Sequence, residues 1–311
     1  MFEFLNPQPK RSSSVRDFAR QIFEHKDFEA GLKKINYCHA SLQEDDDPKG
    51  LMLLGYSGTG KTTLLQAYKR FIDEHHGVDL SSNKNHIPVL YLRLKASTTT
   101  KQFLRQIAEE LHGHPSEKAS EPQLECLVRE LLVQRRTEIV FLDEFHHLLK
   151  SGTERQITQV ANTIKILLDD THIPFVLAGS PHSNLILERN PELQRRFENS
   201  YTMRVLAAND KQAVIYCCHI LQLCENYIKV PTPKLNDRKM ALRFIIASNG
   251  MLSYIFDIIK GALESAGDGN PVEMKHLSDG YHKSRNQAIT SLFDPFTASF
   301  EDVRKVAGGA K

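Results

Sequence analysis

Gly55-Tyr56-Ser57-Gly58-Thr59-Gly60-Lys61-Thr62 matches the pattern G-x-x-x-x-G-K-[ST] at every fixed position. Its glycines permit a tight turn in which backbone N–H groups curl around phosphates. In such a loop Lys61 reaches the β- and γ-phosphates, and the Thr62 hydroxyl is placed to ligate Mg²⁺. All of these residues, with Thr63 directly after them, are candidate nucleotide contacts. The stretch predicts a site for a nucleoside triphosphate such as ATP; the alternative is a chance glycine-rich turn.

The segments around this loop have the pattern of an α/β protein. Residues 51–54 are apolar and predict a short buried strand, and residues 62–71 predict a helix whose N-terminus faces the bound anion. Strand and helix patterns then alternate, which indicates a parallel sheet with crossover helices. The further predicted strands are 87–93, 139–142, 175–178 and 201–206, and the helices are 101–111, 123–134 and 154–169. Apolar spacing also predicts one or two helices within 15–42.

After Asn209 the patterns are helical only. The predicted helices are 210–227, 237–248, 251–266 and 274–290. We therefore expect four parts, namely a flexible segment 1–14, a nucleotide-binding domain 15–208, a helical lid domain 209–291, and a loosely ordered tail 292–311.

A second motif follows the predicted strand at 139–142. Its four apolar residues lead into Asp143 and Glu144, and open α/β sheets place their ligands at the carboxyl ends of such strands. Asp143 is expected to hold the Mg²⁺, and Glu144 to polarise an attacking water, which predicts hydrolysis and not binding alone. The alternative is an acidic pair attracted by a helix N-terminus.

Two later features supply further candidate contacts to the γ-phosphate. Ser180 follows the strand 175–178 and could hydrogen-bond the γ-phosphate or the lytic water. Arg195 and Arg196 lie just before the last predicted strand, where an arginine would protrude toward the γ-phosphate of a neighbouring subunit. The alternative for this pair is an ordinary basic surface at a helix end.

Composition excludes several classes of protein. Of 311 residues, 41% are hydrophobic and 25% are charged, and no apolar run approaches the length of a membrane span, so we expect a cytoplasmic protein. The five cysteines lack metal-like pairing and are expected to be free thiols. The pairs His75-His76 and His146-His147 are not expected to bind one metal, because adjacent side chains point apart on a helix or strand.

Taken together, these motifs resemble those of AAA+ ATPases. Phe-Leu-Asp-Glu-Phe-His-His-Leu at 141–148 and Ala-Gly-Ser-Pro-His at 178–182 are similar to the TniB/TnsC family of transposition ATPases. The resemblance implies Lys61 and Thr62 as the Walker A pair, Asp143 and Glu144 as the Walker B pair, and Ser180 as sensor 1. It also implies an arginine finger at Arg195 or Arg196.

The resemblance further implies ATP-dependent homo-oligomers on double-stranded DNA that couple a target-selecting protein to a transposase. One departure concerns the sensor-2 arginine of many AAA+ lids, since 251–254 reads Met-Leu-Ser-Tyr. Slow, oligomer-dependent turnover is therefore expected. A net charge of +2 neither requires nor excludes DNA binding.

Candidate DNA contacts lie beside short hydroxyl side chains that suit phosphate contacts. They are Lys95, Lys101, Arg105, Lys150 and Arg155. Solvated helix faces with an N-cap threonine are an equal alternative. Two other functions stay open, namely an assembly ATPase resembling the ExeA-type secretion ATPases and a nucleotide-switched scaffold with little catalysis.

Overall fold

The computed structural model describes residues 13–44, 49–76, 86–95, 98–151, 153–284 and 293–309. Within these ranges the chain forms two compact units. One runs from Lys26 to Arg204, and the other joins the residues before Lys26 to those from Val205 onward.

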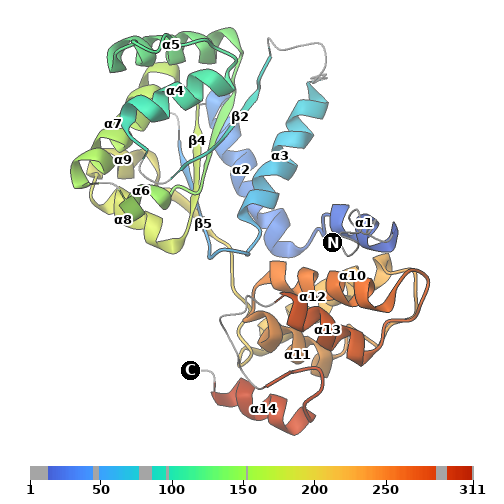
Figure 1. Ribbon diagram of the computed structural model, residues 1–311. Helices are drawn as coiled ribbons and strands as arrows, with labels where there is room; N and C mark the ends of the chain where they lie inside the picture. Colours follow the sequence, from blue (N-terminus) through green and yellow to red (C-terminus); the bar gives the residue numbers. More distant parts are fainter. Residues whose placement is uncertain are drawn as a thin grey trace, which may run out of the picture. The chain divides into compact units, whose positions relative to one another are not determined.

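The unit 26–204 is built on a five-stranded parallel sheet (Figure 1). The strands are β1 (Leu51–Leu54), β2 (Val89–Arg93), β3 (Ile139–Asp143), β4 (Phe175–Gly179) and β5 (Asn199–Thr202), in the spatial order β2-β3-β4-β1-β5. β1, β3 and β4 are buried along their whole length, as expected for apolar strands covered on both faces. The predicted α/β fold with a parallel sheet is therefore confirmed.

The last strand differs from its prediction. β5 ends at Thr202, whereas the sequence suggested 201–206. The N–H of Leu206 donates to the Gly250 carbonyl at 3.0 Å, within the second unit, and so cannot extend the sheet. The other predicted strands are confirmed, and β2 begins directly after Pro88.

Helices cover both faces of the sheet (Figure 1). One face carries α2 (Lys26–Glu44) and α3 (Lys61–His75), and the other carries α4 (Thr100–Glu110), α5 (Glu121–Gln134) and α7 (Glu154–Thr171). Thr99 and Thr153 form capping boxes with Gln102 and Gln156 and so fix the starts of α4 and α7. Short helices follow the strands, namely α6 (His147–Ser151), η1 (Pro181–Ser183), α8 (Asn184–Glu188) and α9 (Pro191–Arg196).

The register of the strands brings their carboxyl ends to one edge of the sheet. Leu54 pairs with Gly179 on one side and with Thr202 on the other, and Arg93 pairs with Asp143. The loops after β1, β3 and β4 therefore lie together, which is where an open α/β sheet binds its ligand.

The second unit is helical. It contains α1 (Ser13–Arg20), α10 (Lys211–Tyr227), α11 (Arg238–Ser248), α12 (Leu252–Ala266), α13 (Met274–Ser284) and α14 (Phe300–Gly309). Its apolar core includes Val15, Phe18 and Phe23. Residues 13–25 therefore pack with the helical unit, whereas the sequence assigned 15–25 to the nucleotide-binding domain.

The C-terminal region also differs from the expected loosely ordered tail. Residues 300–309 form α14, and Phe296 and Val303 are buried, so the segment contributes apolar side chains to a packed surface. Most of the segment expected to be flexible, residues 1–12, and the end of the predicted helix 274–290 lie outside the described residues.

No described helix is long and apolar enough to span a membrane on its own. α11 and α12, which are bent by 106° at their junction, pass that test of length and composition only as a pair.

Candidate nucleotide-binding site

The loop 55–60 connects β1 to the first turn of α3. Gly60 precedes the helix with φ 99°, a conformation that side chains disfavour. At Gly55 a Cβ atom would lie 2.6 Å from Thr59 Oγ1, so only glycine fits that close approach. The Thr59 hydroxyl donates to the Tyr56 carbonyl at 2.9 Å and holds the turn closed. The loop thus presents the N-terminus of α3, a ready-made anion site.

Lys61 lies beneath this loop and is 8% exposed. Its Nζ donates to the carbonyls of Gly55 at 2.7 Å and Tyr56 at 3.0 Å. Burial lowers the pKa of Lys61, and the carboxylates of Glu144 and Asp143 act in the opposite direction. The ammonium group is therefore held by the loop's own carbonyls and lies close to both acidic residues of the second motif.

Asp143, at the end of β3, is fully buried, and its carboxylate accepts three hydrogen bonds. Its Oδ2 accepts from Thr62 Oγ1 at 2.7 Å and from the Tyr91 hydroxyl at 2.8 Å, and its Oδ1 accepts from the Glu144 N–H at 2.8 Å. The predicted pair Thr62 and Asp143 is thus brought together across 81 positions of sequence. Mg²⁺ binds oxygen ligands, so a hydroxyl and a carboxylate in contact fit that ion.

Tyr91 is a site residue that sequence reasoning missed. It stands on β2, opposite Phe141 of β3, and its hydroxyl reaches the neighbouring strand end. Burial, with a further contribution from Asp143, raises the pKa of Tyr91, so its hydroxyl remains a donor at neutral pH. Only the register of β2 against β3 reveals this contact.

Glu144 has an unusual backbone and two side-chain neighbours. Its φ is 58°, a left-handed conformation that is costly for a side chain of this size. Its Oε1 lies 3.3 Å from Arg93 Nη2, and its Oε2 lies 3.3 Å from His146 Nδ1. The carboxylate is therefore held at the end of β2 and β3, beside the phosphate loop.

The positions of His146 and His147 contradict one expectation from the sequence. The rings of His146 and His147 lie 4.6 Å apart, and ligand atoms of Glu144, His146 and His147 all lie within 4.8 Å of one another. The expectation that adjacent histidines point apart was wrong here because residues 144–146 form a turn, where the alternation of helices and strands does not apply.

Ser180 follows β4 at the same edge of the sheet. The Gly55 N–H donates to the Gly179 carbonyl at 3.1 Å, which joins this strand end to the phosphate loop. Ser180 is half-buried, and its hydroxyl makes no hydrogen bond to a described residue. Ser183, one turn later, is fully buried and its Oγ has no hydrogen-bond partner among the described residues. The sequence pattern did not single out this second hydroxyl.

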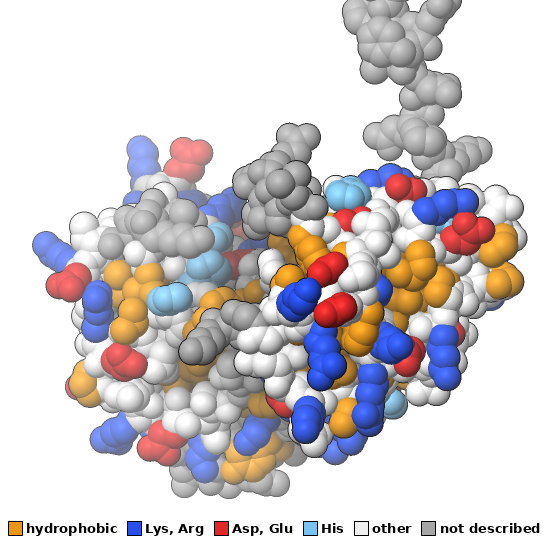
Figure 2. Space-filling view, turned by 90° about the horizontal axis from the view of Figure 1, so that it is seen from below, with side chains coloured by type: hydrophobic (Ala, Val, Ile, Leu, Met, Phe, Trp, Pro, Cys, Tyr) orange, Lys and Arg blue, Asp and Glu red, His pale blue; other side chains and the backbone are white. Residues whose placement is uncertain are grey.

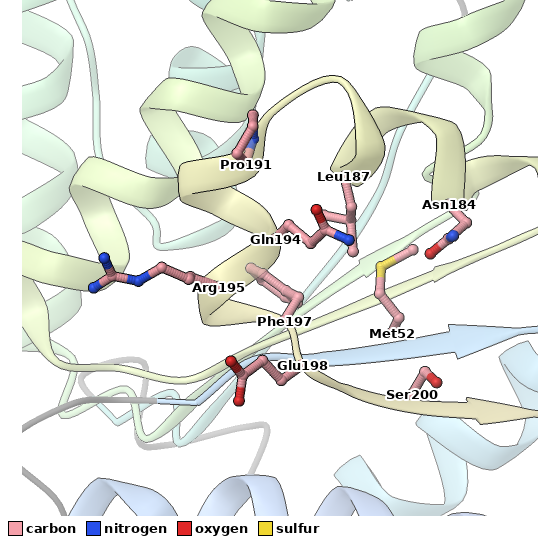
Figure 3. Close-up of a pocket in the computed structure, with 9 residues that line it drawn as sticks. All are labelled: Met52, Asn184, Leu187, Pro191, Gln194, Arg195, Phe197, Glu198 and Ser200. Atoms are coloured by element: carbon pink, nitrogen blue, oxygen red, sulfur yellow. The ribbon is translucent and has the colours of Figure 1, made fainter.

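The two candidate finger arginines have different surroundings. Arg196 is half-buried, and its Nε lies 3.0 Å from Asp169 Oδ1 on α7. Arg195 is exposed and makes no hydrogen bond or ion pair with a described residue. It lines an open cleft of about 420 Å³ with Gln194 and Glu198, and Figure 3 shows its side chain extending away from both. Arg195 is therefore free to reach another molecule.

The candidate DNA-binding residues also differ in their burial and hydrogen bonds. The Arg105 guanidinium donates to the carbonyls of Pro115, Ser116 and Glu117 at 3.3, 2.8 and 3.3 Å. Its hydrogen-bond donors are therefore engaged by the backbone of the loop that follows α4. Lys95 follows β2 and is exposed, and Lys101, in the first turn of α4, is half-buried. Arg155 is exposed at the start of α7, and the side chain of Lys150 lies outside the described residues.

One face of the molecule carries side chains of both charges (Figure 2). Figure 2 shows Lys and Arg side chains over much of the face seen from below, with Asp and Glu between them. This mixture agrees with the net charge of +2.

Comparisons with solved structures assign the fold. The chain resembles Orc1 of Aeropyrum pernix in complex with DNA (17% identity, TM-score 0.63, 86% of this chain and 69% of that chain). It also resembles ORC2 of Aeropyrum pernix in ADPNP-ADP complexes (17% identity, TM-score 0.65, 88% and 72%) and Cdc6p of Pyrobaculum aerophilum (14%, TM-score 0.64, 86% and 70%). The chain has the AAA+ P-loop ATPase fold.

At the level of sequence, no curated protein matches the chain. The family model described as "Bacterial TniB protein" matches residues 19–205, which is more than half of the chain.

Proposed function

The chain belongs to the TniB family of bacterial proteins, and from this premise we propose that it is an ATPase that assembles on double-stranded DNA during transposition. The observation that carries the ATPase assignment is the contact of Thr62 with Asp143 directly beside Lys61 and Glu144. A phosphate loop alone would support only nucleotide binding.

We assign a residue of this chain to each step of hydrolysis. Lys61 would exchange its bonds to the Gly55 and Tyr56 carbonyls for bonds to the β- and γ-phosphates. Thr62 and Asp143 would hold Mg²⁺, which when bound neutralises charge on the phosphates. Glu144 would then accept a hydrogen bond from the attacking water and orient it toward the γ-phosphate.

One hydroxyl and one arginine complete the proposed site. Ser180 follows β4, whose end is joined to the phosphate loop, and its half-buried hydroxyl can donate to the γ-phosphate or the water. Arg195 would serve a neighbouring subunit, because Arg196 is occupied by Asp169. An arginine supplied in this way accelerates phosphoryl transfer by about 10³–10⁵ in related systems.

The surroundings of Glu144 support slow turnover by an isolated subunit. Its carboxylate lies within 3.3 Å of both Arg93 and His146. The Arg93 guanidinium donates to Glu144, and a carboxylate engaged in this way is a weaker acceptor for water, so in this proposal assembly or DNA releases it. The same observation favours the second candidate, a nucleotide-switched scaffold, if release never occurs.

We propose that DNA binding rests on phosphate contacts and not on base edges. The Orc1 structure contains DNA, and Lys95, Lys101 and Arg155 are the candidate side chains not engaged by a described carbonyl. Such contacts position a protein without reading sequence, which suits a protein that marks many targets. A transposase and a target-selecting protein are the proposed partners, and the cytoplasm is the proposed compartment.

A mobility-shift assay with duplex DNA tests this proposal. The proposed function predicts a shift of several unrelated duplexes with ATP and Mg²⁺, and a much weaker shift without nucleotide. Equal absence of binding in both conditions would refute the DNA-dependent part, and phosphate release would then show whether an ATPase of another kind remains.

A further inference from the structure

A group of histidines lies at the sheet edge opposite the phosphate loop. His76 is the C-cap of α3, His86 lies three residues before the start of β2, and Glu138 lies just before β3. Ligand atoms of these three side chains all lie within 4.8 Å of one another. α3 begins at the phosphate loop, and its 15 residues span about 22 Å at 1.5 Å per residue, so this group is remote from the proposed chemistry.

One distance in this group matches the separation of two ligands on one metal ion. His76 Nε2 lies 3.2 Å from Glu138 Oε2. Two ligand atoms on one tetrahedral Zn²⁺, each bonded at about 2.05 Å, lie about 3.3 Å apart. The rings of His76 and His86 have centroids 5.1 Å apart, and His86 makes no hydrogen bond to a described residue. Its imidazole therefore has a lone pair available.

The backbone holds two of these residues in place. The Ile87 N–H, next to His86, donates to the Arg135 carbonyl at 2.9 Å, and the Glu138 N–H donates to the Pro88 carbonyl at 2.8 Å. These bonds fix the entries to β2 and β3 side by side. Two of the three candidate ligands thus come from the start of the rigid sheet, as a preformed site requires.

A fourth residue positions the carboxylate. His39, on α2, places its Nε2 3.2 Å from the same Glu138 Oε2, and its Nδ1 lies 2.9 Å from the Tyr68 hydroxyl. Its side chain is 13% exposed. Ligating carboxylates are commonly held by such hydrogen-bonded partners.

We propose that His76, His86 and Glu138 bind a divalent transition metal ion of the zinc class, with His39 as the residue that positions Glu138. Two imidazoles and a carboxylate are ligands that suit Zn²⁺ and leave a fourth position for water. The ion would join the end of α3 to the starts of β2 and β3. This proposal is independent of ATP hydrolysis and of DNA binding.

The test is calorimetric titration of the full chain with Zn²⁺ alone, without nucleotide, after removal of any affinity tag and stripping with a chelator. One Zn²⁺ per chain is expected. His39→Ala should weaken binding by about 10–100-fold, and His86→Ala and Glu138→Gln by at least as much. His114→Ala is the control, because His114 is an exposed histidine that belongs to neither group of candidate ligands.

His146→Ala tests whether Zn²⁺ binds instead at the second group of candidate ligands, formed by Glu144, His146 and His147. Zinc affinity that survives His86→Ala and Glu138→Gln but is lost in His146→Ala would overturn the proposal, as would no binding by the unaltered chain. Co²⁺ bound to the unaltered chain gives a check that needs no variant. Its visible bands should appear without the intense thiolate charge-transfer band, and that band would instead show binding at cysteine, such as the exposed Cys126.

Discussion

Tyr91→Phe removes one hydroxyl from a contact that holds the fully buried Asp143. The lost hydrogen bond, 2.8 Å long, runs to a carboxylate oxygen that also accepts from Thr62. A hydrogen bond to a charged group contributes about 1.5–3 kcal/mol. The ring of phenylalanine fills the same space, so no cavity term is added. We therefore expect the unit 26–204 to lose about 1.5–3 kcal/mol of unfolding free energy, or roughly 3–12 °C of melting temperature.

Urea unfolding followed by circular dichroism measures this change, with a melting curve as the second reading. Tyr37→Phe is the matched control, because Tyr37 lies in the same unit and is 56% exposed, and its effect should stay within about 0.5 kcal/mol. If Tyr91→Phe were as stable as that control, the hydroxyl would not support Asp143, and the geometry of the proposed Mg²⁺ ligand would need another explanation.

The remaining predictions concern turnover and DNA. Glu144→Gln should keep ATP binding and suppress phosphate release, because the amide keeps the shape and loses the base; normal release would mean that another group orients the water. A mixture of inactive Arg195→Ala and inactive Glu144→Gln proteins should regain activity at interfaces that pair an intact arginine with an intact base, whereas co-assembled mixtures that stay inactive would exclude Arg195 as the finger. Lys101→Ala should weaken binding to all duplexes alike and flatten the plot of log K against log salt by about 0.9, while Arg105→Ala should leave that slope unchanged. A salt slope that Lys101→Ala does not alter would remove Lys101 from the DNA contacts.

The sequence predicted those parts of the fold that depend on local patterns. β1, β4 and the first four residues of β3 are short apolar runs, a pattern typical of buried strands. The loop 55–62 has its glycines and lysine at fixed spacing, so the motif is complete without tertiary information. The fold class followed from these local signals and is confirmed.

Contacts that depend on register or on distant packing were not predictable. Tyr91 reads as one more apolar residue of β2, and only the pairing with β3 brings its hydroxyl to Asp143. The segment around Phe18 has a helical pattern, but nothing in it says which of two cores will bury it. His39 and Glu138 are 99 positions apart, so their approach at 3.2 Å has no sequence signature.

The central claim is that the loop 55–62 binds ATP through Lys61. Calorimetric titration with ATP and Mg²⁺ tests it most directly when the unaltered chain is compared with Lys61→Ala. We predict tight binding by the unaltered chain and none by the variant, because the variant lacks the charge that faces the β- and γ-phosphates. Equal affinity of the two proteins for ATP would contradict the assignment of the site.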